Sequence, residues 1–423
     1  MKQITALKIL QEGHNVFLTG SAGAGKSYTL RRFIEHLHKN KINVAVTASS
    51  GVAATILGGS TVHSYTCIGI KSSISATDIY NIRRKVPIAN RLKELQVLII
   101  DEISMLHGRQ LDMINYVLKS IRKDFRPFGG VQVVVAGDFF QLPPVGSEPA
   151  KDRFAFMSRT WIESAFKVCY LTEQHRQSDN DLNLILNAIR EDKVSEYHKD
   201  LLKKTVTNQL SEDPTKLFTH NQDVDALNNY KLNQLTTNAH LFKAVTEGSA
   251  ADVKFLSENV LSPPELTLKI GARVMFTKNH SEGLYVNGTL GTVVNFTTLI
   301  GSRHIPIVRL ADGSNLPVEE QVWEKQDEFG QVKAKYTQIP LRLAWAITCH
   351  KSQGLTLDEA EINLAGTFEM GQGYVALSRL RDISGLRLLG MNDKSLKLDP
   401  LARKADIRFQ ALSDELVKEY GEE

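Results

Sequence analysis

A glycine-rich loop that ends in lysine and serine lies near the start of the sequence. Residues 20–27 read GSAGAGKS, a G-x-x-x-x-G-K-S pattern that follows the apolar run NVFLTG and opens a basic helical stretch. Glycines let the backbone curl around a phosphate with its N–H groups pointing inward, and the helix N-terminus adds a favourable field. The pattern indicates a nucleoside triphosphate site, with Lys26 on the β- and γ-phosphates and Ser27 on Mg²⁺. The strand–loop–helix context disfavours the alternative, a flexible Gly/Ser turn. The residues expected to contact the nucleotide from this segment are Gly20, Ala22, Gly23, Ala24, Gly25, Lys26, Ser27 and Tyr28.

Two adjacent carboxylates end a second apolar run, VLIIDEISM. Asp101 would hold Mg²⁺ directly or through water, and Glu102 would orient and deprotonate an attacking water. Hydrolysis, as opposed to nucleotide binding alone, needs that second carboxylate. The alternative is an acidic pair in a solvated turn. Because the glycine-rich loop is also present, we expect the two strands to lie side by side and to direct both groups at one γ-phosphate.

Three further residues could act on the same phosphate. Gln141, in GDFFQLPPV, is placed to sense the γ-phosphate or the water, while Pro143 and Pro144 stiffen the segment. Arg176 in LTEQHRQ and Arg379 in YVALSR are candidates for the cations that charge in the transition state requires. The alternatives are a structural turn around Gln141 and ordinary surface ion pairs for the two arginines.

The hydrophobic pattern predicts the elements that position these residues. Short β-branched runs each end in a small or polar cluster, as buried parallel strands do, and they cover residues 15–20, 42–49, 97–102 and 131–138. Between them lie stretches such as 26–40 and 109–123, whose apolar positions fall near the helical period. We expect a doubly wound α/β domain over the first ~170 residues, with ligands at the carboxyl ends of its strands.

A second α/β cycle starts at KLFTH, residues 216–220, and its middle is interrupted. From about Gly288 to Pro340, runs such as TLGTVVNF and HIPIVRLADG indicate short strands joined by turns, which predicts a small all-β insert. The tail DELVKEYGEE is expected to form a solvated terminal helix. Trp323 and Trp345 could stack on bases, although core positions are favoured.

Composition limits the class of protein. A chain of 423 residues divides into roughly three compact units, and its 23% charged residues are ordinary for soluble folds. The net charge of +4 is too small for a uniformly basic surface, so a polyanion must be held in a local groove. The basic run at 83–85 is favoured as a solvated face. Cys67, Cys169 and Cys349 form no C-x-x-C pair, which argues against a disulfide framework or a zinc site. With no targeting or membrane segment recognised, a reducing cytoplasm, near the nucleoid in a bacterium, is expected.

Taken in order, these strings resemble the motifs of helicase superfamily one, on its RecD-like branch. The strings are GSAGAGKS, TASSGVAA, GGSTVHS, DEISM, GDFFQLPPV, LTEQHRQ, LFTHNQ, AITCHKSQGLTL and GYVALSR. More narrowly, SIRKDFRPFGGVQVVVAGDFFQLPPV is similar to the signature of the petite-integration-frequency (PIF) family of DNA helicases, and the resemblance runs from about Gln3 to about Arg387. It implies two RecA-like domains, ATP and Mg²⁺ as cofactors, and 5′-to-3′ movement on single-stranded DNA.

The resemblance also implies domain boundaries. It places the first RecA-like domain at 1–172, with a short strand-separating insert near 67–90, the second at 173–285 and 341–400, and an SH3-like β-barrel at 286–340. The C-terminal helix expected from the charged tail covers 401–423. By position Gln3 matches the family's adenine-reading glutamine, whereas the alternative is an exposed terminal side chain.

Single-stranded DNA is bound without regard to sequence by hydroxyls, amides and a few cations. On the first domain we expect these contacts from Thr47, Ser50, Gly51, Thr61 and His63. On the second domain we expect them from His350, Lys351, Ser352 and Gln353. His63 could instead be a satisfied core or cap histidine.

The predicted function is therefore an ATP-dependent DNA helicase that acts, as a monomer, on single-stranded DNA and on forked or tailed duplexes. Three rivals stay open: a nucleic-acid-binding module with a nucleotide latch and no turnover, the motor subunit of a recombination nuclease, and an RNA motor. The sequence does not determine the preference for G-quadruplexes or RNA–DNA hybrids, the wedge residue or the step size. It also does not determine whether the pathway served is repair, recombination or telomere maintenance.

Overall fold

The computed structural model describes the chain apart from residues 51–52, 55–59, 70, 72, 145–149, 174–179, 212–213, 279, 281, 286, 300–302, 327–331, 350–351, 354–355 and 422–423. Contacts divide it into two compact units. The first unit comprises 1–201, 369–382 and 393–423, and the second comprises 202–368 and 383–392. Residues 369–382, expected in the second domain, therefore pack with the first unit. The expected boundaries of the functional domains stay predictions.

The first unit is built on a six-stranded sheet in which every pairing is parallel. The strand order is β3-β2-β4-β5-β1-β6. The strands are β1 (Val16–Gly20), β2 (Val44–Ala48), β3 (Ser60–Thr61), β4 (Val97–Asp101), β5 (Gln132–Ala136) and β6 (Lys167–Leu171). The four strands predicted from the β-branched runs are confirmed, and the loops that carry the chemistry follow their carboxyl ends.

One expected neighbour relation is wrong. The strand before the glycine-rich loop, β1, does not pair with β4, which carries Asp101, because β5 lies between them. Apolar runs of similar composition give no information on which of them pair, so strand order could not be obtained from the sequence. The order places the turn after β5, with Gln141, between the glycine-rich loop and the two carboxylates.

The helices of the first unit surround this sheet. They are α1 (Gln3–Gln11), α2 (Lys26–Lys39), α4 (Val62–Tyr65), α5 (Ala76–Arg84), α6 (Val86–Glu94), α7 (Gly108–Arg122), α8 (Ala150–Arg153), α9 (Arg159–Glu163), α10 (Asn180–Glu191), α14 (Gln372–Leu377) and α15 (Pro400–Tyr420). Helix α11 (Glu196–Lys204) contains the division between the two units, because the first unit ends at Leu201. Short 3₁₀ turns cover Ile103–Met105, Pro127–Gly130 and Ala155–Met157. In α2 the buried positions recur at helical spacing, so its apolar stripe faces the core.

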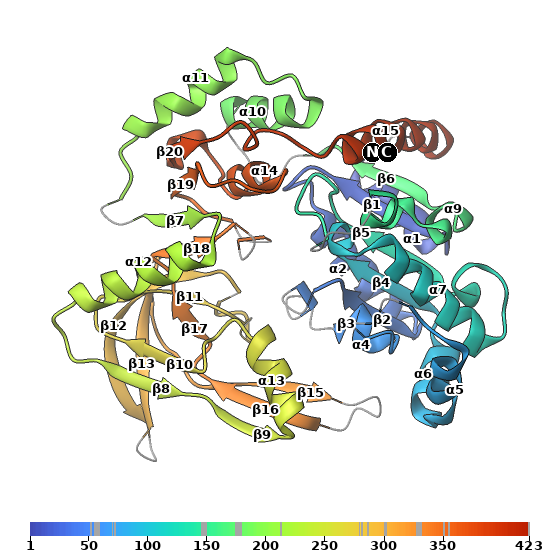
Figure 1. The fold of residues 1–423 in the computed structure, drawn as a ribbon, viewed down its shortest axis with the longest axis horizontal. Helices are drawn as coiled ribbons and strands as arrows, with labels where there is room; N and C mark the ends of the chain where they lie inside the picture. Colours follow the sequence, from blue (N-terminus) through green and yellow to red (C-terminus); the bar gives the residue numbers. More distant parts are fainter. Residues whose placement is uncertain are drawn as a thin grey trace. The chain divides into compact units, whose positions relative to one another are not determined.

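The C-terminal helix α15 is more than a solvated tail. It lies beside β6, as Figure 1 shows in dark red and green, and it buries Ala402, Phe409 and Ser413. Leu416, Val417 and Tyr420 pack against the core of the first unit. The expectation of a solvated helix is therefore corrected: the charged residues of the tail cover only its outer face.

The second unit has a smaller parallel sheet in the order β18-β7-β19-β20. Its strands are β7 (Thr215–Phe218), β18 (Ala346–Thr348), β19 (Ala360–Leu364) and β20 (Leu386–Met391), and α12 (Asn221–Gln234) packs beside β18 and β7. Short 3₁₀ turns cover Thr205–Thr207 and Ile383–Gly385. The second α/β cycle predicted from the sequence is thus present.

Antiparallel strands interrupt this cycle. A five-stranded sheet contains β11 (Arg273–Phe276), β12 (Leu290–Leu299), β13 (Arg303–Leu310), β14 (Asn315–Pro317) and β17 (Leu341–Leu343). Two smaller sheets and one helix accompany it: β8 (His240–Lys243) with β10 (Glu265–Leu268), β9 (Val245–Gly248) with β15 (Gln321–Gln326) and β16 (Val332–Gln338), and α13 (Ala250–Asn259). Antiparallel pairing thus begins before residue 286, and an SH3-like barrel stays a prediction.

The two tryptophans of this unit lie in its cores. Trp345 is 3% exposed and belongs to the cluster around Phe276, while Trp323 is 5% exposed and packs with Tyr336. The core interpretation is confirmed for both side chains, which are covered by their own unit and so do not present a face to a base.

Candidate nucleotide and nucleic-acid site

The glycine-rich loop has the geometry of a phosphate cradle. Gly25 caps α2 with a left-handed backbone (φ 86°), which a residue with a Cβ rarely adopts. The Lys26 Nζ donates to the carbonyls of Gly20 and Ser21, each at 2.9 Å. These two hydrogen bonds hold the ammonium over the loop, at the N-terminus of a 14-residue helix. A bound phosphate would compete with the two carbonyls for the ammonium. The residues present therefore fit a nucleoside triphosphate.

Gln3 lies against the same loop. As the first residue of α1, it donates its backbone N–H to the Glu173 carboxylate at 2.8 Å, and its side-chain Nε2 donates to the Ala24 carbonyl at 3.4 Å. A Cβ at position 25 would come within 2.1 Å of that Nε2. The left-handed conformation therefore favours glycine at position 25, whereas a Cβ there would displace the flexible end of the Gln3 side chain, which lies beside the nucleotide loop.

The paired carboxylates are fixed by different means. Asp101 ends β4, and its Oδ1 accepts the Glu102 N–H at 2.9 Å. Burial raises the pKa of Asp101, whereas that hydrogen bond and the nearby charge of Lys26 lower it. Glu102 has a left-handed backbone (φ 52°), and its carbonyl accepts from Ser49 Oγ at 2.6 Å. A non-glycine residue held in this conformation is an outlier of the kind that gathers at functional sites.

The oxygen ligands fit Mg²⁺. This cation takes one or two protein oxygens and fills its octahedron with water and substrate phosphates. Asp101 is the last residue of β4, and Ser27 is the second residue of α2. Among the described residues no group of three or more His, Cys, Asp and Glu side chains could hold a metal ion. A site made from one carboxylate, one hydroxyl and nucleotide phosphates needs no such group.

The remaining phosphate-site candidates have different outcomes. Gln141 is 7% exposed, and its N–H donates to the Asp138 carbonyl at 3.0 Å in a turn after β5. Arg379 is 1% exposed; its Nε donates to the Val375 carbonyl and one terminal nitrogen donates to Ser378 Oγ, both at 2.9 Å. The alternative interpretation of Arg379 as a surface ion pair is therefore wrong, because the side chain is buried. Arg176 lies outside the described residues.

A buried arginine that was not predicted from the sequence lies beside these segments. In α10, Arg190 is 8% exposed and donates to Asp138 Oδ2 at 2.8 Å and to the Tyr374 hydroxyl at 2.7 Å. It also donates to the Tyr170 hydroxyl at 2.5 Å and to Asp406 at 3.4 Å. Burial alone would lower the pKa of Arg190, but these four partners raise it, so the guanidinium stays charged. We call these five side chains the Arg190 network.

A sequence signal for this arginine does exist. Arg190 continues the four-residue spacing of Leu182 and Leu186, which are buried on the inner face of α10. A cation on an otherwise apolar helical face must have buried partners, because an unpaired charge there costs several kcal/mol. That rule predicts a buried partner but not its identity, since Asp138, Tyr374 and Asp406 are far away in the chain.

Two of the expected DNA contacts, Thr47 and Ser352, have buried side chains. Thr47 is fully buried, and its hydroxyl donates to the Ile99 carbonyl at 2.6 Å, which ties β2 to β4. Ser352 is also fully buried, and its hydroxyl donates to the Cys349 carbonyl at 2.8 Å. The Thr47 hydroxyl thus links two strands and the Ser352 hydroxyl stabilises its own turn. Side chains near a strand end can point to either face of the sheet, so this burial could not be predicted. Neither residue presents an exposed atom to a polynucleotide.

The other first-unit candidates keep partly exposed positions. Ser50 Oγ accepts the Ala53 N–H at 3.2 Å, and Thr61 Oγ1 caps α4 by accepting the Ser64 N–H at 3.2 Å. Burial lowers the pKa of His63, with a hydrogen bond to Gln110 acting in the opposite direction. The imidazole is therefore neutral at neutral pH and suits hydrogen bonding or stacking rather than ionic contact. Gly51 lies outside the described residues.

The second-unit candidates are less fully placed. Gln353 is half-buried in a turn after β18. His350 and Lys351 lie outside the described residues, so their expected contacts stay predictions. As with the first unit, the segment follows the carboxyl end of a parallel strand, where ligands of open α/β sheets bind.

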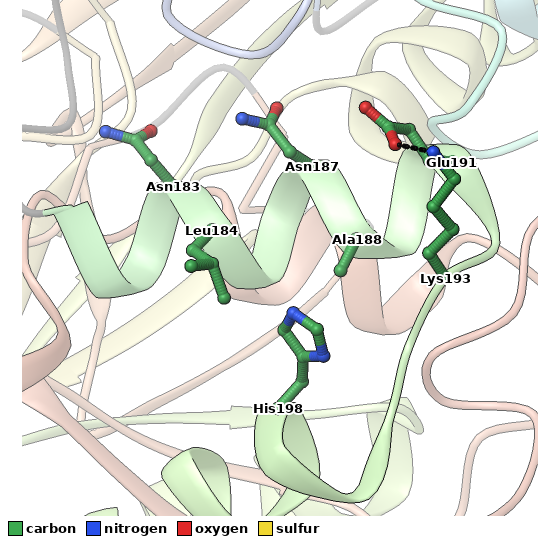
Figure 2. A pocket seen from close by; sticks show the side chains of 7 residues that line it. All are labelled: Asn183, Leu184, Asn187, Ala188, Glu191, Lys193 and His198. Carbon is green, nitrogen blue, oxygen red and sulfur yellow. Dashed lines mark hydrogen bonds and ion pairs between the residues drawn. The ribbon is translucent and has the colours of Figure 1, made fainter.

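A separate hollow lies between α10 and α11. It is a shallow, open depression with a volume of about 470 Å³, lined by Asn183, Leu184, Asn187, Ala188, Glu191, Lys193 and His198. Figure 2 shows the imidazole facing the apolar side chains of α10, with a hydrogen bond of 2.7 Å from Lys193 to Glu191 at one end. None of the residues expected at nucleotide or DNA lines it, so this hollow is distinct from the phosphate cradle.

Comparisons with known proteins agree with this geometry. Residues 1–210 match the family model described as PIF1-like helicase. The chain is 48% identical to the ATP-dependent DNA helicase Pif1 of Psychrobacter sp. (strain PRwf-1), over 99% of this chain and 72% of that protein. No described helix has the length and apolar character needed to cross a membrane.

Solved structures agree as well. The structure of Bacteroides sp. Pif1 in complex with ADP-AlF4 has a TM-score of 0.82 and 30% identity, covering 97% of this chain and 96% of that one. A structure described as DNA unwinding at forked dsDNA by two coordinating Pif1 helicases has a TM-score of 0.67 and 32% identity, covering 98% and 97%. The predicted fold of two RecA-like α/β domains is thereby confirmed, and the chain belongs to the PIF1-like helicase family.

Proposed function

We propose that this chain is an ATP-dependent DNA helicase that moves 5′-to-3′ along single-stranded DNA. The observation that carries the proposal is the convergence of Lys26, folded over the glycine-rich loop, with Asp101 and Glu102 at a nearby strand end. A relative of this chain at 48% identity is named an ATP-dependent DNA helicase, and a similar structure holds ADP-AlF4. Membership in the family and the site chemistry therefore support the same activity.

Each residue has a distinct role at the phosphates in this proposal. Bound Mg·ATP supplies the phosphoryl bond whose hydrolysis drives the motor. Lys26 and the loop amides bind the phosphates, Ser27 and Asp101 hold Mg²⁺, and the Gln3 amide reads the adenine edge. Glu102 orients a water and accepts its proton on a carboxylate oxygen.

Three further side chains complete the hydrolytic site. Gln141 orients the water, as a switch glutamine does, and Arg379 with Arg176 stabilises charge that develops in the transition state. Burial of Arg379 supports this role, because a guanidinium removed from water acts more strongly on a nearby anion.

DNA is held by groups that do not read sequence. We assign these contacts to Ser50, Thr61 and His63 on the first unit and to Gln353 on the second, with Gly51, His350 and Lys351 as further candidates. Forked or tailed duplexes are the proposed substrates, consistent with the fork described for a similar structure. That structure involves two helicases, whereas we propose that one copy of this chain suffices for translocation.

Replacement of Lys26 by Ala tests the proposal. The variant should lose DNA-stimulated phosphate release, because the ammonium that offsets phosphate charge is gone, while fold and DNA affinity persist. Lys39→Ala is the matched control, since Lys39 ends the same helix and is exposed. The measurement is phosphate release with and without oligonucleotide, together with thermal unfolding and DNA binding by fluorescence anisotropy. Wild-type turnover in the Lys26 variant would remove the assignment.

A further inference from the structure

The hydroxyl of Tyr374 joins the Arg190 network to the glycine-rich loop. It accepts from Arg190 Nη1 at 2.7 Å and from the backbone N–H of Ala22 at 3.4 Å, and it donates to Asp138 Oδ2 at 3.1 Å. Tyr374 is 1% exposed, and Ala22 is 5% exposed. One donor proton and both lone pairs of the phenol oxygen are therefore used, without solvent.

This arrangement connects three segments of the proposed nucleotide site. Ala22 is in the phosphate loop, Asp138 begins the turn that carries Gln141, and Tyr374 is on α14, which precedes Arg379. Asp138 Oδ1 also accepts the Phe140 N–H at 3.1 Å, which fixes that turn. A Cβ at Gly371, the N-cap of α14, would lie 2.9 Å from the Phe140 carbonyl oxygen, so the helix start and the turn are in close contact.

The loop needs such an anchor because of its own composition. Glycines at 20, 23 and 25 give residues 20–25 wide conformational freedom, and ordering a flexible loop on binding costs free energy. A hydrogen bond from the Ala22 N–H to a rigid phenol restricts the loop before nucleotide arrives. The phenol is itself rigid, because a buried cation and a buried carboxylate hold its oxygen.

We propose that Tyr374, held by Arg190 and Asp138, is a positioning residue that sets nucleotide affinity by fixing the phosphate loop through the Ala22 N–H. The inference rests on the proposed function and adds a residue that does not touch the reacting atoms. Arg190 acts through Tyr374, and Asp138 couples the same anchor to the Gln141 turn. Loss of the hydroxyl should therefore weaken nucleotide binding while leaving the chemical step nearly unchanged.

The network supplies its own matched control. Tyr170 also accepts from Arg190, through Nη2 at 2.5 Å, and donates to Asp406 at 3.3 Å, but its hydroxyl makes no described contact with the loop. Tyr170→Phe and Tyr374→Phe each remove one buried hydroxyl from the same guanidinium. Thermal unfolding of both variants measures the shared structural cost, and only Tyr374→Phe removes the link to Ala22.

The experiment measures a fluorescent ADP analogue binding to the full chain, amide hydrogen exchange of residues 20–25 without nucleotide, and KM and kcat for ATP with single-stranded DNA. Tyr374→Phe should weaken ADP binding and raise KM about three- to tenfold, the value of one lost hydrogen bond. Its loop amides should exchange faster, and kcat should stay within about twofold. Tyr170→Phe should match wild type in all of these.

Each result supports or contradicts the positioning role of Tyr374. Unchanged or tighter ADP binding in Tyr374→Phe, or equal weakening in Tyr170→Phe, would overturn the positioning role. A wild-type chain that binds the ADP analogue but releases no phosphate with DNA would instead contradict the proposed function. In that case the binding and exchange measurements would still test the anchor, so the two failures are distinguishable.

Discussion

Glu102 combines an unusual backbone with the role of general base that we propose for it. Its left-handed conformation costs of order 1–3 kcal/mol for a residue with a side chain, and the structure retains it through hydrogen bonds to its carbonyl from Ser49 Oγ and the Met105 N–H. A strained backbone conformation of this kind is retained where it orients a side chain that function requires. The conformation turns the chain sharply after β4, and so gives Glu102 a direction that an extended strand residue following Asp101 would not have.

Glu102→Gln isolates that role. The amide keeps the shape of the side chain but cannot accept a proton from water, so kcat for DNA-stimulated hydrolysis should fall about 10²- to 10⁴-fold. Affinity for an ADP analogue should stay near wild type, because the loop and Lys26 are unaltered. Stopped-flow phosphate release measures kcat, and titration with the ADP analogue measures nucleotide affinity. A kcat reduced by less than about tenfold would assign the proton to another group.

Residues were predictable where the chemistry imposes a local pattern. Lys26, Asp101 and Glu102 could be proposed from the sequence because phosphate binding and water activation demand fixed residue types at the ends of apolar strands. The burial of Thr47 and Ser352 could not be predicted, because a hydroxyl at or near a strand end can equally donate to a buried carbonyl. The Arg190 network was missed because its five members come from separate segments, and Arg190 and Asp406 are 216 residues apart.

At the scale of elements, α15 shows what local pattern leaves out. Helix position and length were predicted, but its docking was not, because the tail is rich in charge and its apolar residues are widely spaced. Phe409 is 6% exposed and its ring lies 4.9 Å from that of Phe17 and 6.1 Å from that of Phe139. The C-terminal helix thus completes an aromatic cluster that includes the strand leading into the nucleotide loop.

Phe409→Ala should therefore destabilise the first unit by about 3–5 kcal/mol, since it leaves a cavity among packed rings. Ile407→Ala is the control, because Ile407 lies on the same helix and is 67% exposed; its change should stay within about 0.5 kcal/mol. Chemical denaturation followed by tryptophan fluorescence measures both, with Trp161 near the ring of Phe409 as a reporter. Equal effects from the two changes would mean that α15 is not docked in solution.

The whole molecule carries a net charge of only +4, so it cannot hold DNA by its overall field. In the proposed function, binding comes instead from local groups at strand ends in both units. Such contacts grip the backbone and faces of one strand without distinguishing sequence, and the backbone itself has a direction. Two grips that tighten alternately on a directional polymer produce motion in one sense only.

Duplexes with a single-stranded tail on either the 5′ or the 3′ end test the direction of movement directly. Separating one base pair costs ~1.4 kcal/mol of stacking on average, a modest load for each step, so travel toward the junction is sufficient for strand release. A helicase loaded on a 5′ tail and moving 5′-to-3′ meets the junction, whereas one loaded on a 3′ tail moves away from it. Unwinding with ATP and Mg²⁺ should therefore require the 5′ tail, and Lys26→Ala should release neither strand. Preferential release from the 3′-tailed duplex would reverse the assigned direction while leaving the nucleotide chemistry in place, because Lys26, Asp101 and Glu102 act on phosphate irrespective of which way the strand is drawn.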